Sequence, residues 1–140
     1  MEPIIYLTFN GRCREAMTHY AEVLGGTVER VFTNAMAPAD ACRIPGGDDL
    51  VMNMAIRLGN TQVMASDAPA AWYSPPQGFS VAVAPASRAE FDRVYAALAV
   101  DRQSEPMPPG ETFWAERFAM FTDRFGTPWM LLFAGSKATD

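Results

Sequence analysis

The sequence predicts an α+β fold in which one unit, strand–helix–strand–strand–strand, occurs twice along the 140 residues. Equivalent positions of the two first strands, Ile5 and Ser80, lie 75 residues apart. The helices that follow also begin 75 residues apart, at Arg12 and Ser87. In each half, the apolar spacing changes from the two-residue period of a strand to that of a helix and back. One unit alone would leave an apolar sheet face uncovered, so we expect the two units to pair within a single domain, 1–140.

The first unit is predicted over residues 1–67. Its helix has apolar residues at helical spacing and ends at Gly25-Gly26, because glycine readily adopts the left-handed conformation that ends a helix. Gly59-Asn60 is typical of a two-residue turn between antiparallel strands. A long surface loop is expected over 34–49. The expected strands are Ile4–Phe9, Thr27–Thr33 with Val28, Arg30 and Phe32 on one face, Leu50–Leu58 and Thr61–Ser66.

A linker rich in proline and alanine is predicted over 68–77, and the second unit over 78–140. Ser87 followed by Glu90 is a capping-box pattern and predicts the start of the second helix. Residues 106–109 contain three prolines and are interpreted as a joint between helix and hairpin. The expected strands are Phe79–Val83, Trp114–Thr122 and Pro128–Phe133, the last two joined by the turn at 123–126.

Composition excludes several classes of function. The net charge is −5, and no basic cluster exists that would bind the phosphates of nucleic acid or an anionic membrane surface. No apolar stretch approaches the roughly 20 residues of a membrane span, and the start of the sequence lacks a signal-peptide pattern. We therefore expect a cytoplasmic protein in which Cys13, on a helix, and Cys42, in a loop, are reduced thiols.

Five segments then point to a known family: YLTFNG at 6–11, HYAEVLGG at 19–26, VMASDA at 63–68, GFSVAV at 78–83 and ETFWAERFAMFTDRFGTPWML at 111–131. Together they make the chain resemble the PhnB-like branch of the vicinal oxygen chelate superfamily, which has the glyoxalase, bleomycin-resistance and dioxygenase fold. The resemblance implies two βαβββ modules whose mixed sheets form a curled, barrel-like structure around a cavity. It also implies a homodimer. Some relatives carry a demethylubiquinone methyltransferase-like label, but no glycine-rich methyl-donor loop follows a strand here.

The metalloenzymes of that superfamily hold a metal at four inward positions. Carried onto this sequence, those positions are Ile5 or Tyr6, Met64, Phe79 and Met130. Hard divalent cations prefer imidazole, carboxylate or water, and a thioether suits only soft metals. The chain has a single histidine, His19, which is expected to be solvated or at the edge of the core. The sequence therefore predicts no metal ion and no cofactor.

The acids offer a different chemistry. Asp67 follows a predicted strand, so its carboxylate is expected to accept hydrogen bonds in a turn or at a helix cap. The alternative is that Asp67 is an acid in the pocket. Asp123, in TDRFG, suits an acceptor for backbone N–H groups of the hairpin turn. Glu116 lies between Trp114 and Phe118; an exposed carboxylate is expected, and an inward one would have a raised pKa and act as acid or base.

The segment 111–130 contains six of the sixteen aromatic residues, and strand alternation divides such side chains between core and cavity. A soft apolar lining suits a flat or apolar ligand held by stacking and burial. We therefore expect a small apolar or aromatic molecule to bind in the cavity. The alternative is a glyoxalase-like lyase, isomerase or dioxygenase that depends on a metal or on Glu116 or Asp67. The predicted ligand-binding residues are Tyr6, Met64, Phe79, Trp114, Phe118 and Met130.

Overall fold

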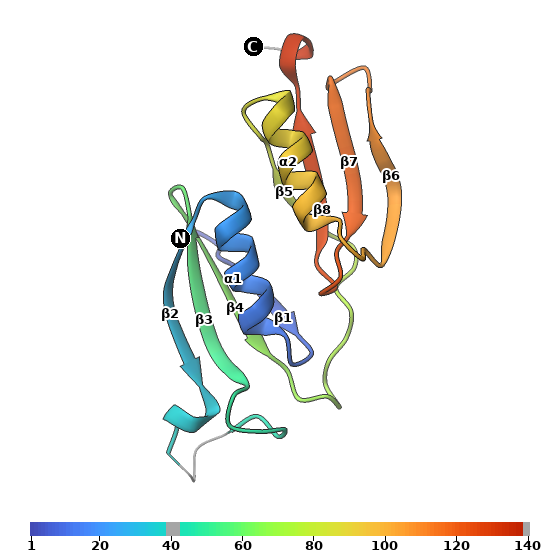
Figure 1. Cartoon of the computed structure of the whole chain (residues 1–140). Helices are drawn as coiled ribbons and strands as arrows, with labels where there is room; N and C mark the ends of the chain where they lie inside the picture. Colours follow the sequence, from blue (N-terminus) through green and yellow to red (C-terminus); the bar gives the residue numbers. More distant parts are fainter. Residues whose placement is uncertain (39–42, 139–140) are drawn as a thin grey trace. The chain divides into compact units, whose positions relative to one another are not determined.

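The computed structural model describes residues 1–38 and 43–138 (Figure 1). The chain divides into two compact units, Met1–Ser74 and Pro75–Asp140, which we call unit 1 and unit 2. Each unit is a four-stranded mixed sheet with one helix, and the described strands form two separate sheets, not one closed barrel. The fold is α+β, as the repeat predicts. Cys42, for which a loop position is expected, lies outside the described residues.

Unit 1 contains three strands of seven or eight residues, a first strand of five residues and one α-helix. Its sheet has the order β1-β4-β3-β2; β1 runs parallel to β4, and the remaining pairs are antiparallel. The helix ends as predicted, because Gly25 takes a left-handed φ of 72°. The elements are β1 (Ile5–Phe9), α1 (Cys13–Leu24), β2 (Thr27–Thr33), the short 3-10 helix η1 (Asn34–Met36), β3 (Val51–Leu58) and β4 (Thr61–Asp67).

Unit 2 repeats this topology with the sheet order β5-β8-β7-β6. Again the first strand, β5, runs parallel to the last, β8, and the other pairs are antiparallel. The side chain of Ser87 accepts a hydrogen bond from the Glu90 N–H, which confirms the predicted cap. The elements are β5 (Val81–Val83), α2 (Arg88–Leu98), β6 (Ser104–Gly110), β7 (Arg117–Thr122), β8 (Pro128–Phe133) and the 3-10 helix η2 (Gly135–Lys137).

Two expectations about unit 2 are wrong. The proline-rich residues 106–109 belong to strand β6 and are not a joint. β6 lies at the edge of the sheet, where prolines are tolerated because no further strand needs their missing N–H groups. Trp114 and Glu116 precede β7, which begins at Arg117. There the chain turns around Thr112, whose hydroxyl accepts hydrogen bonds from the N–H groups of Trp114 and Ala115.

Each sheet has one face against the helix of its own unit and one face that this helix does not cover, which we call the open face. Helix-facing side chains of the strands form the core together with the apolar stripe of the helix. The largest buried side chains are Tyr20, Phe9, Met17, Met54 and Ile56 in unit 1, and Trp129, Phe91, Phe121, Leu98 and Leu131 in unit 2.

A bulge in β2 interrupts the alternation that the sequence suggests. Val28 pairs with Ile56, whereas Arg30 pairs with Ala55, so the register shifts at Glu29. Ile56 is a buried, helix-facing residue, and Ala55 has the opposite orientation. Val28 and Arg30 therefore do not share a face, in contrast to the prediction. The extra residue of a bulge is what separates them.

Candidate functional site

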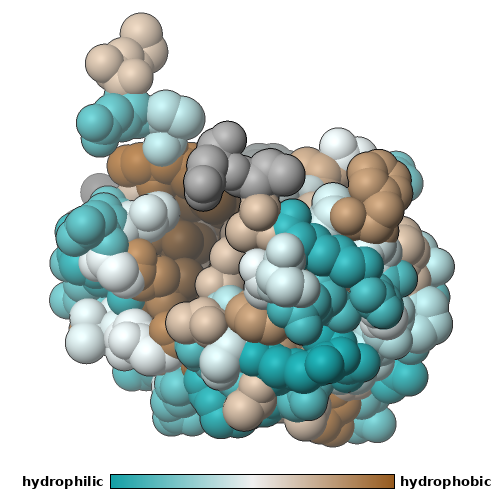
Figure 2. Space-filling model, turned by 90° about the horizontal axis from the view of Figure 1, so that it is seen from above, coloured by the Kyte–Doolittle hydropathy of each residue, from teal (hydrophilic) through white to brown (hydrophobic). Residues whose placement is uncertain are grey.

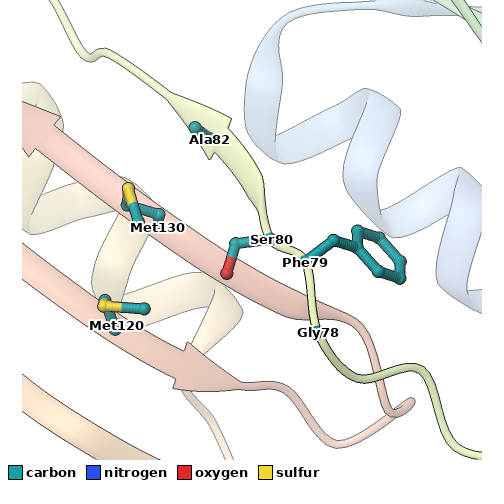
Figure 3. A pocket seen from close by; sticks show the side chains of 6 residues that line it. All are labelled: Gly78, Phe79, Ser80, Ala82, Met120 and Met130. Carbon is teal, nitrogen blue, oxygen red and sulfur yellow. The ribbon is translucent and has the colours of Figure 1, made fainter.

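A cavity of about 460 Å³ lies on unit 2. In Figure 3 the thioethers of Met120 and Met130 and the Ser80 hydroxyl group lie on one side of the sheet, and the Phe79 ring points away from the two thioethers. Among the described residues, no ionisable side chain lines the cavity, so its chemistry is that of thioether, aromatic and methyl groups with one hydroxyl. The lining residues are Gly78, Phe79, Ser80, Ala82, Met120 and Met130.

Strand register explains why two methionines meet here. Ala82 pairs with Met130, Met130 with Met120, and Met120 with Met107, so these four residues form one row across the whole sheet. We call it the methionine row. Its neighbours along β7 and β8 in the register, Ala119 and Leu131, are buried on the helix face. The row therefore lies on the open face, where thioethers provide an adaptable apolar surface.

Three aromatic rings lie close to one another near the start of β7. The Trp114 ring packs edge-on against Phe113 and Phe118, with centroid separations of 4.8 and 5.4 Å. Phe118 is buried, Trp114 is 41% exposed and Phe113 is 89% exposed. Edge-to-face contacts of this kind hold the rings in place, so the exposed indole has a defined orientation. Trp114 and Phe118 are not among the residues that line the cavity.

In unit 1, Tyr6 and Met64 face each other across the parallel strands β1 and β4. Tyr6 is 48% exposed, and Met64 is half-buried. Their row continues through Ala55 on β3 to Arg30 on β2. Of the six predicted ligand-binding residues, Phe79 and Met130 therefore share the cavity of unit 2, whereas Tyr6 and Met64 share a row of the other sheet.

Asp67 is buried at the end of β4, and its carboxylate accepts two backbone N–H groups. Cys13 donates to Oδ1 at 3.0 Å and Val51 to Oδ2 at 2.9 Å. Cys13 is the first residue of α1, which has no side-chain cap of its own. Asp67 thus supplies from β4 the acceptor that a local cap would supply, and its negative charge stabilises the N-terminal end of the helix.

Glu116 binds the end of the described chain. Its Oε2 accepts the N–H of Ser136 at 2.6 Å. Gly135, which has a φ of 58°, lies so close that an added Cβ would be 1.6 Å from this oxygen. The carboxylate therefore caps η2, and it does not line the cavity of unit 2.

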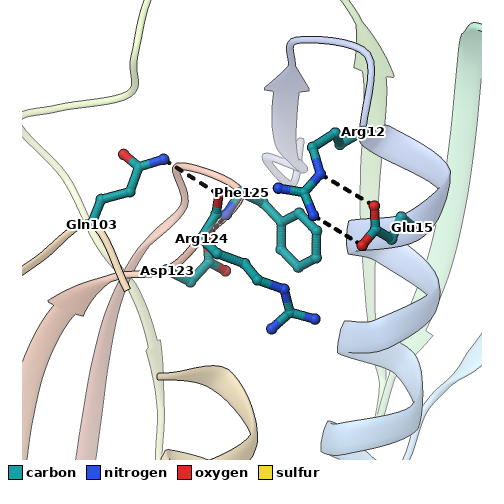
Figure 4. A network of polar contacts seen from close by, with 6 residues as sticks. All are labelled: Arg12, Glu15, Gln103, Asp123, Arg124 and Phe125. Atoms are coloured by element: carbon teal, nitrogen blue, oxygen red, sulfur yellow. Dashed lines mark hydrogen bonds and ion pairs between the residues drawn. The ribbon is translucent and has the colours of Figure 1, made fainter. Parts of the chain in front are cut away.

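Asp123 organises the turn between β7 and β8 (Figure 4). Oδ1 accepts the N–H groups of Phe125 and Thr127, and Oδ2 accepts the indole N–H of Trp129 at 2.8 Å. Next to it, Gln103 donates to the Arg124 carbonyl at 3.4 Å, and the Arg124 guanidinium lies over the Phe125 ring. In unit 1, the same figure shows the ion pair between Arg12 and Glu15.

The described residues do not suit a hard metal ion. Within 1–38 and 43–138, no group of three or more His, Cys, Asp or Glu side chains is placed to hold one. The four positions implied by the superfamily carry Ile5 or Tyr6, Met64, Phe79 and Met130, whose side chains lack the imidazole and carboxylate ligands of such ions. In the same part of the chain, no helix is long and apolar enough to cross a membrane.

Cys13 is the one cysteine whose surroundings are described. Burial raises the pKa of its thiol well above the ordinary value, and the negative charge of Asp67 raises it further. A thiol with a raised pKa is a poor nucleophile, because the thiolate is the reactive form. Cys13 is therefore a structural residue of the core.

The sequence matches the family described as 3-demethylubiquinone-9 3-methyltransferase over residues 2–132. The chain belongs to this family. Protein YjdN of Escherichia coli (strain K12) is 30% identical over 136 residues, which cover 90% of each chain. Protein PA1353 from Pseudomonas aeruginosa has a crystal structure that is 40% identical, with a TM-score of 0.83 over 94% of this chain and 96% of that chain.

More distant structures show the fold. A putative 3-demethylubiquinone-9 3-methyltransferase, the PhnB protein from Bacillus cereus, is 22% identical with a TM-score of 0.80 over 96% of this chain and all of that chain. A glyoxylase/bleomycin resistance protein/dioxygenase domain from Frankia sp. EAN1pec is 12% identical with a TM-score of 0.60 over 96% and 97%. Both structures share the fold that the resemblance implies.

Proposed function

We propose that this protein binds a small apolar or aromatic molecule in the cavity of unit 2, without a metal ion. The lining of that cavity is the observation that carries the proposal: Met120, Met130 and Ala82 supply apolar surface, and Ser80 adds one polar group. A volume of about 460 Å³ falls within the range of small-molecule sites, which are lined mainly by apolar groups with a few polar anchors.

The surroundings of Asp67 and Glu116 do not favour catalysis by these acids. Both carboxylate oxygens of Asp67 accept backbone N–H groups in the buried interior of unit 1, and Glu116 caps η2. A general acid or base needs to reach a proton of the substrate, and neither group lines the cavity. The proposal is therefore one of binding, with sequestration or sensing of the ligand as its purpose.

A neutral, apolar fluorescent probe, N-phenyl-1-naphthylamine, tests the proposal. We expect saturable binding to the full chain, weakened about fivefold by Met120→Gln or Met130→Gln, since each removes about half of a buried apolar side chain's contribution. Met107→Gln, at the outer end of the methionine row, is expected to have a smaller effect. Met36→Gln is the matched control, because Met36 is a 59% exposed methionine in unit 1. Absence of saturable binding, or an equal loss with Met36→Gln, would refute the proposal.

We also propose that two copies of the chain associate. Several large apolar side chains are exposed: Phe113 is 89%, Trp72 80% and Phe32 46% exposed. Figure 2 shows hydrophobic areas, in brown, on the face of the molecule in view. Groups of this kind on a surface favour association. Light scattering at micromolar concentration is expected to give twice the chain mass of 15.3 kDa. A monomer mass under those conditions would contradict this expectation.

A further inference from the structure

Hydrogen bonds between three side chains cross the open face of the unit 1 sheet. Arg30 on β2 donates from Nε to Oδ1 of Asn53 on β3, at 3.0 Å. Asn53 in turn donates from Nδ2 to the hydroxyl oxygen of Tyr6 on β1, at 3.4 Å. Arg30 and Tyr6 are both exposed, and Asn53 between them is half-buried. Arg30 and Tyr6 therefore each have a hydrogen-bond partner in Asn53, and both side chains remain exposed.

The direction of these bonds determines what the group can bind. Because the Asn53 carbonyl oxygen accepts from Arg30, its NH₂ group is left to donate to Tyr6. The Tyr6 oxygen is then an acceptor, and its own O–H points to a different partner. Within residues 1–38 and 43–138, neither this O–H nor the terminal nitrogens of Arg30 make a further hydrogen bond. Both ends of the group thus present donors.

The nearby carboxylate does not cancel the charge of Arg30. Glu29 lies at the bulge, and its carboxylate accepts from Gln62 Nε2 and Arg57 Nε, each at 3.1 Å. These bonds, with that from Gln62 the stronger influence, lower the pKa of Glu29, so the carboxylate stays ionised and bound to Arg57. The Arg30 guanidinium also lowers the pKa of Glu29 by its charge, but the hydrogen bonds of this carboxylate go to Gln62 and Arg57.

The surface between the two donor ends is apolar. Met64 and Ala55 lie between Tyr6 and Arg30 in the same row of the sheet. Phe32, which is 46% exposed, pairs with Asn53 and so lies beside the polar group on the same face. A molecule that suits this surface has an anionic oxygen group for the donors and a flat apolar body for Met64 and Phe32.

We propose that Tyr6, Asn53 and Arg30 form a binding site for the carboxylate group of a small aromatic acid. The planar guanidinium of Arg30 matches a carboxylate, the Tyr6 hydroxyl donates a second hydrogen bond, and Asn53 holds both in position. All three residues belong to unit 1. The inference does not depend on the apolar cavity of unit 2, and separate variants test the two sites.

Benzoate is the probe, with benzamide and benzylamine as controls of the same shape and different charge. Titrated into the ¹⁵N-labelled full chain, benzoate is expected to shift the Arg30 Nε–H and Asn53 side-chain amide signals saturably. We expect benzamide to bind about tenfold more weakly, because a charged acceptor strengthens each hydrogen bond. Benzylamine is expected to cause no shift there. Equal affinities of benzoate and benzylamine, or shifts that leave these two signals unchanged, would overturn the proposal.

Variants separate a specific site from general attraction of anions. Arg30→Gln is expected to weaken benzoate binding at least about tenfold, and Tyr6→Phe, which removes one exposed hydroxyl, about threefold to tenfold. Arg14→Gln removes the same charge from an exposed position on α1 and is expected to have no effect. A loss with Arg14→Gln equal to that with Arg30→Gln would contradict the proposal. Loss with Met120→Gln but not with Arg30→Gln would assign benzoate to the cavity of unit 2 and likewise overturn it.

Discussion

The two sheets of this protein share strand order and pairing, yet the matching rows on their open faces differ in chemistry. In unit 1 the row runs from Tyr6 through Met64 and Ala55 to Arg30 and ends in polar groups on both sides. In unit 2 the methionine row contains only apolar side chains. One backbone arrangement thus carries a face suited to hydrogen bonding and charge and another suited to apolar contact.

This difference shows which side chains determine the fold. In both sheets, the buried residues that pack against the helix fix which face lies inside, since a slip by one residue would expose all of them. In unit 1 these buried residues include Met54, Ile56 and Val63, and in unit 2 they include Phe121, Trp129 and Leu131. The open face is free of that constraint, so its residues are available for recognition.

The helices of the two units also begin differently. Ser87 and Glu90 cap α2 locally: the serine accepts the Glu90 N–H, and the glutamate accepts the Ala86 N–H at 3.2 Å. Helix α1 has no such cap and uses Asp67, 54 residues after Cys13. A distant cap joins helix to sheet, because the same carboxylate also holds the Val51 N–H at the start of β3.

The largest effect is expected from removing that distant cap. Asp67→Ala leaves two buried backbone N–H groups without an acceptor, so we expect the free energy of unfolding to fall by about 3 kcal/mol. Ser87→Ala removes one exposed cap and is expected to cost about 1 kcal/mol. Urea denaturation followed by circular dichroism measures both. Equal costs would remove the contrast between the two helix starts.

A smaller effect concerns the pH dependence of stability that the Cys13 thiol on α1 causes; α2 carries no thiol. Burial raises the pKa of Cys13, whereas an unfolded cysteine titrates at about 8.5. Below that pH both states keep the proton, and stability is unaffected. Above it the unfolded chain releases the proton and the folded chain retains it, so stability falls by up to about 1.4 kcal/mol per pH unit.

Denaturant titrations between pH 8.5 and 10 test this in a Cys42→Ser background, where Cys13 is the remaining cysteine. Replacing it with alanine as well is expected to lower stability at pH 7 and to abolish the additional slope. A slope that is the same with and without Cys13 would show that the thiol does not cause it.

Much of the fold could be predicted because its signals are local. Gly25-Gly26, Gly59-Asn60 and the Ser87 cap each act within a few residues, and the structure confirms all three. β6 was not predictable from propensity, because prolines disfavour strands except at an edge, and edge position is a property of the whole sheet. The start of β7 depends similarly on the Thr112 hydroxyl, which holds Trp114 in the preceding turn.

The candidate sites were only partly predictable. Superfamily positions indicated Phe79 and Met130, which do line one cavity, but gave no sign of Met120 as their neighbour. Pairing the residues of β7 and β8 outward from the hairpin turn places Met120 opposite Met130, and this pairing would have identified Met120. The link between Arg30, Asn53 and Tyr6 could not be inferred from the sequence, because the bulge at Glu29 changes the face on which Arg30 lies.

The prolines of β6 have a consequence for aggregation. Three of its seven residues, Pro106, Pro108 and Pro109, have no N–H to offer, so a strand from another molecule finds few donors along this edge. The opposite edge of the same sheet, β5, is only three residues long. The sheet with the more apolar open face is therefore also the one that resists extension into a fibril from both sides.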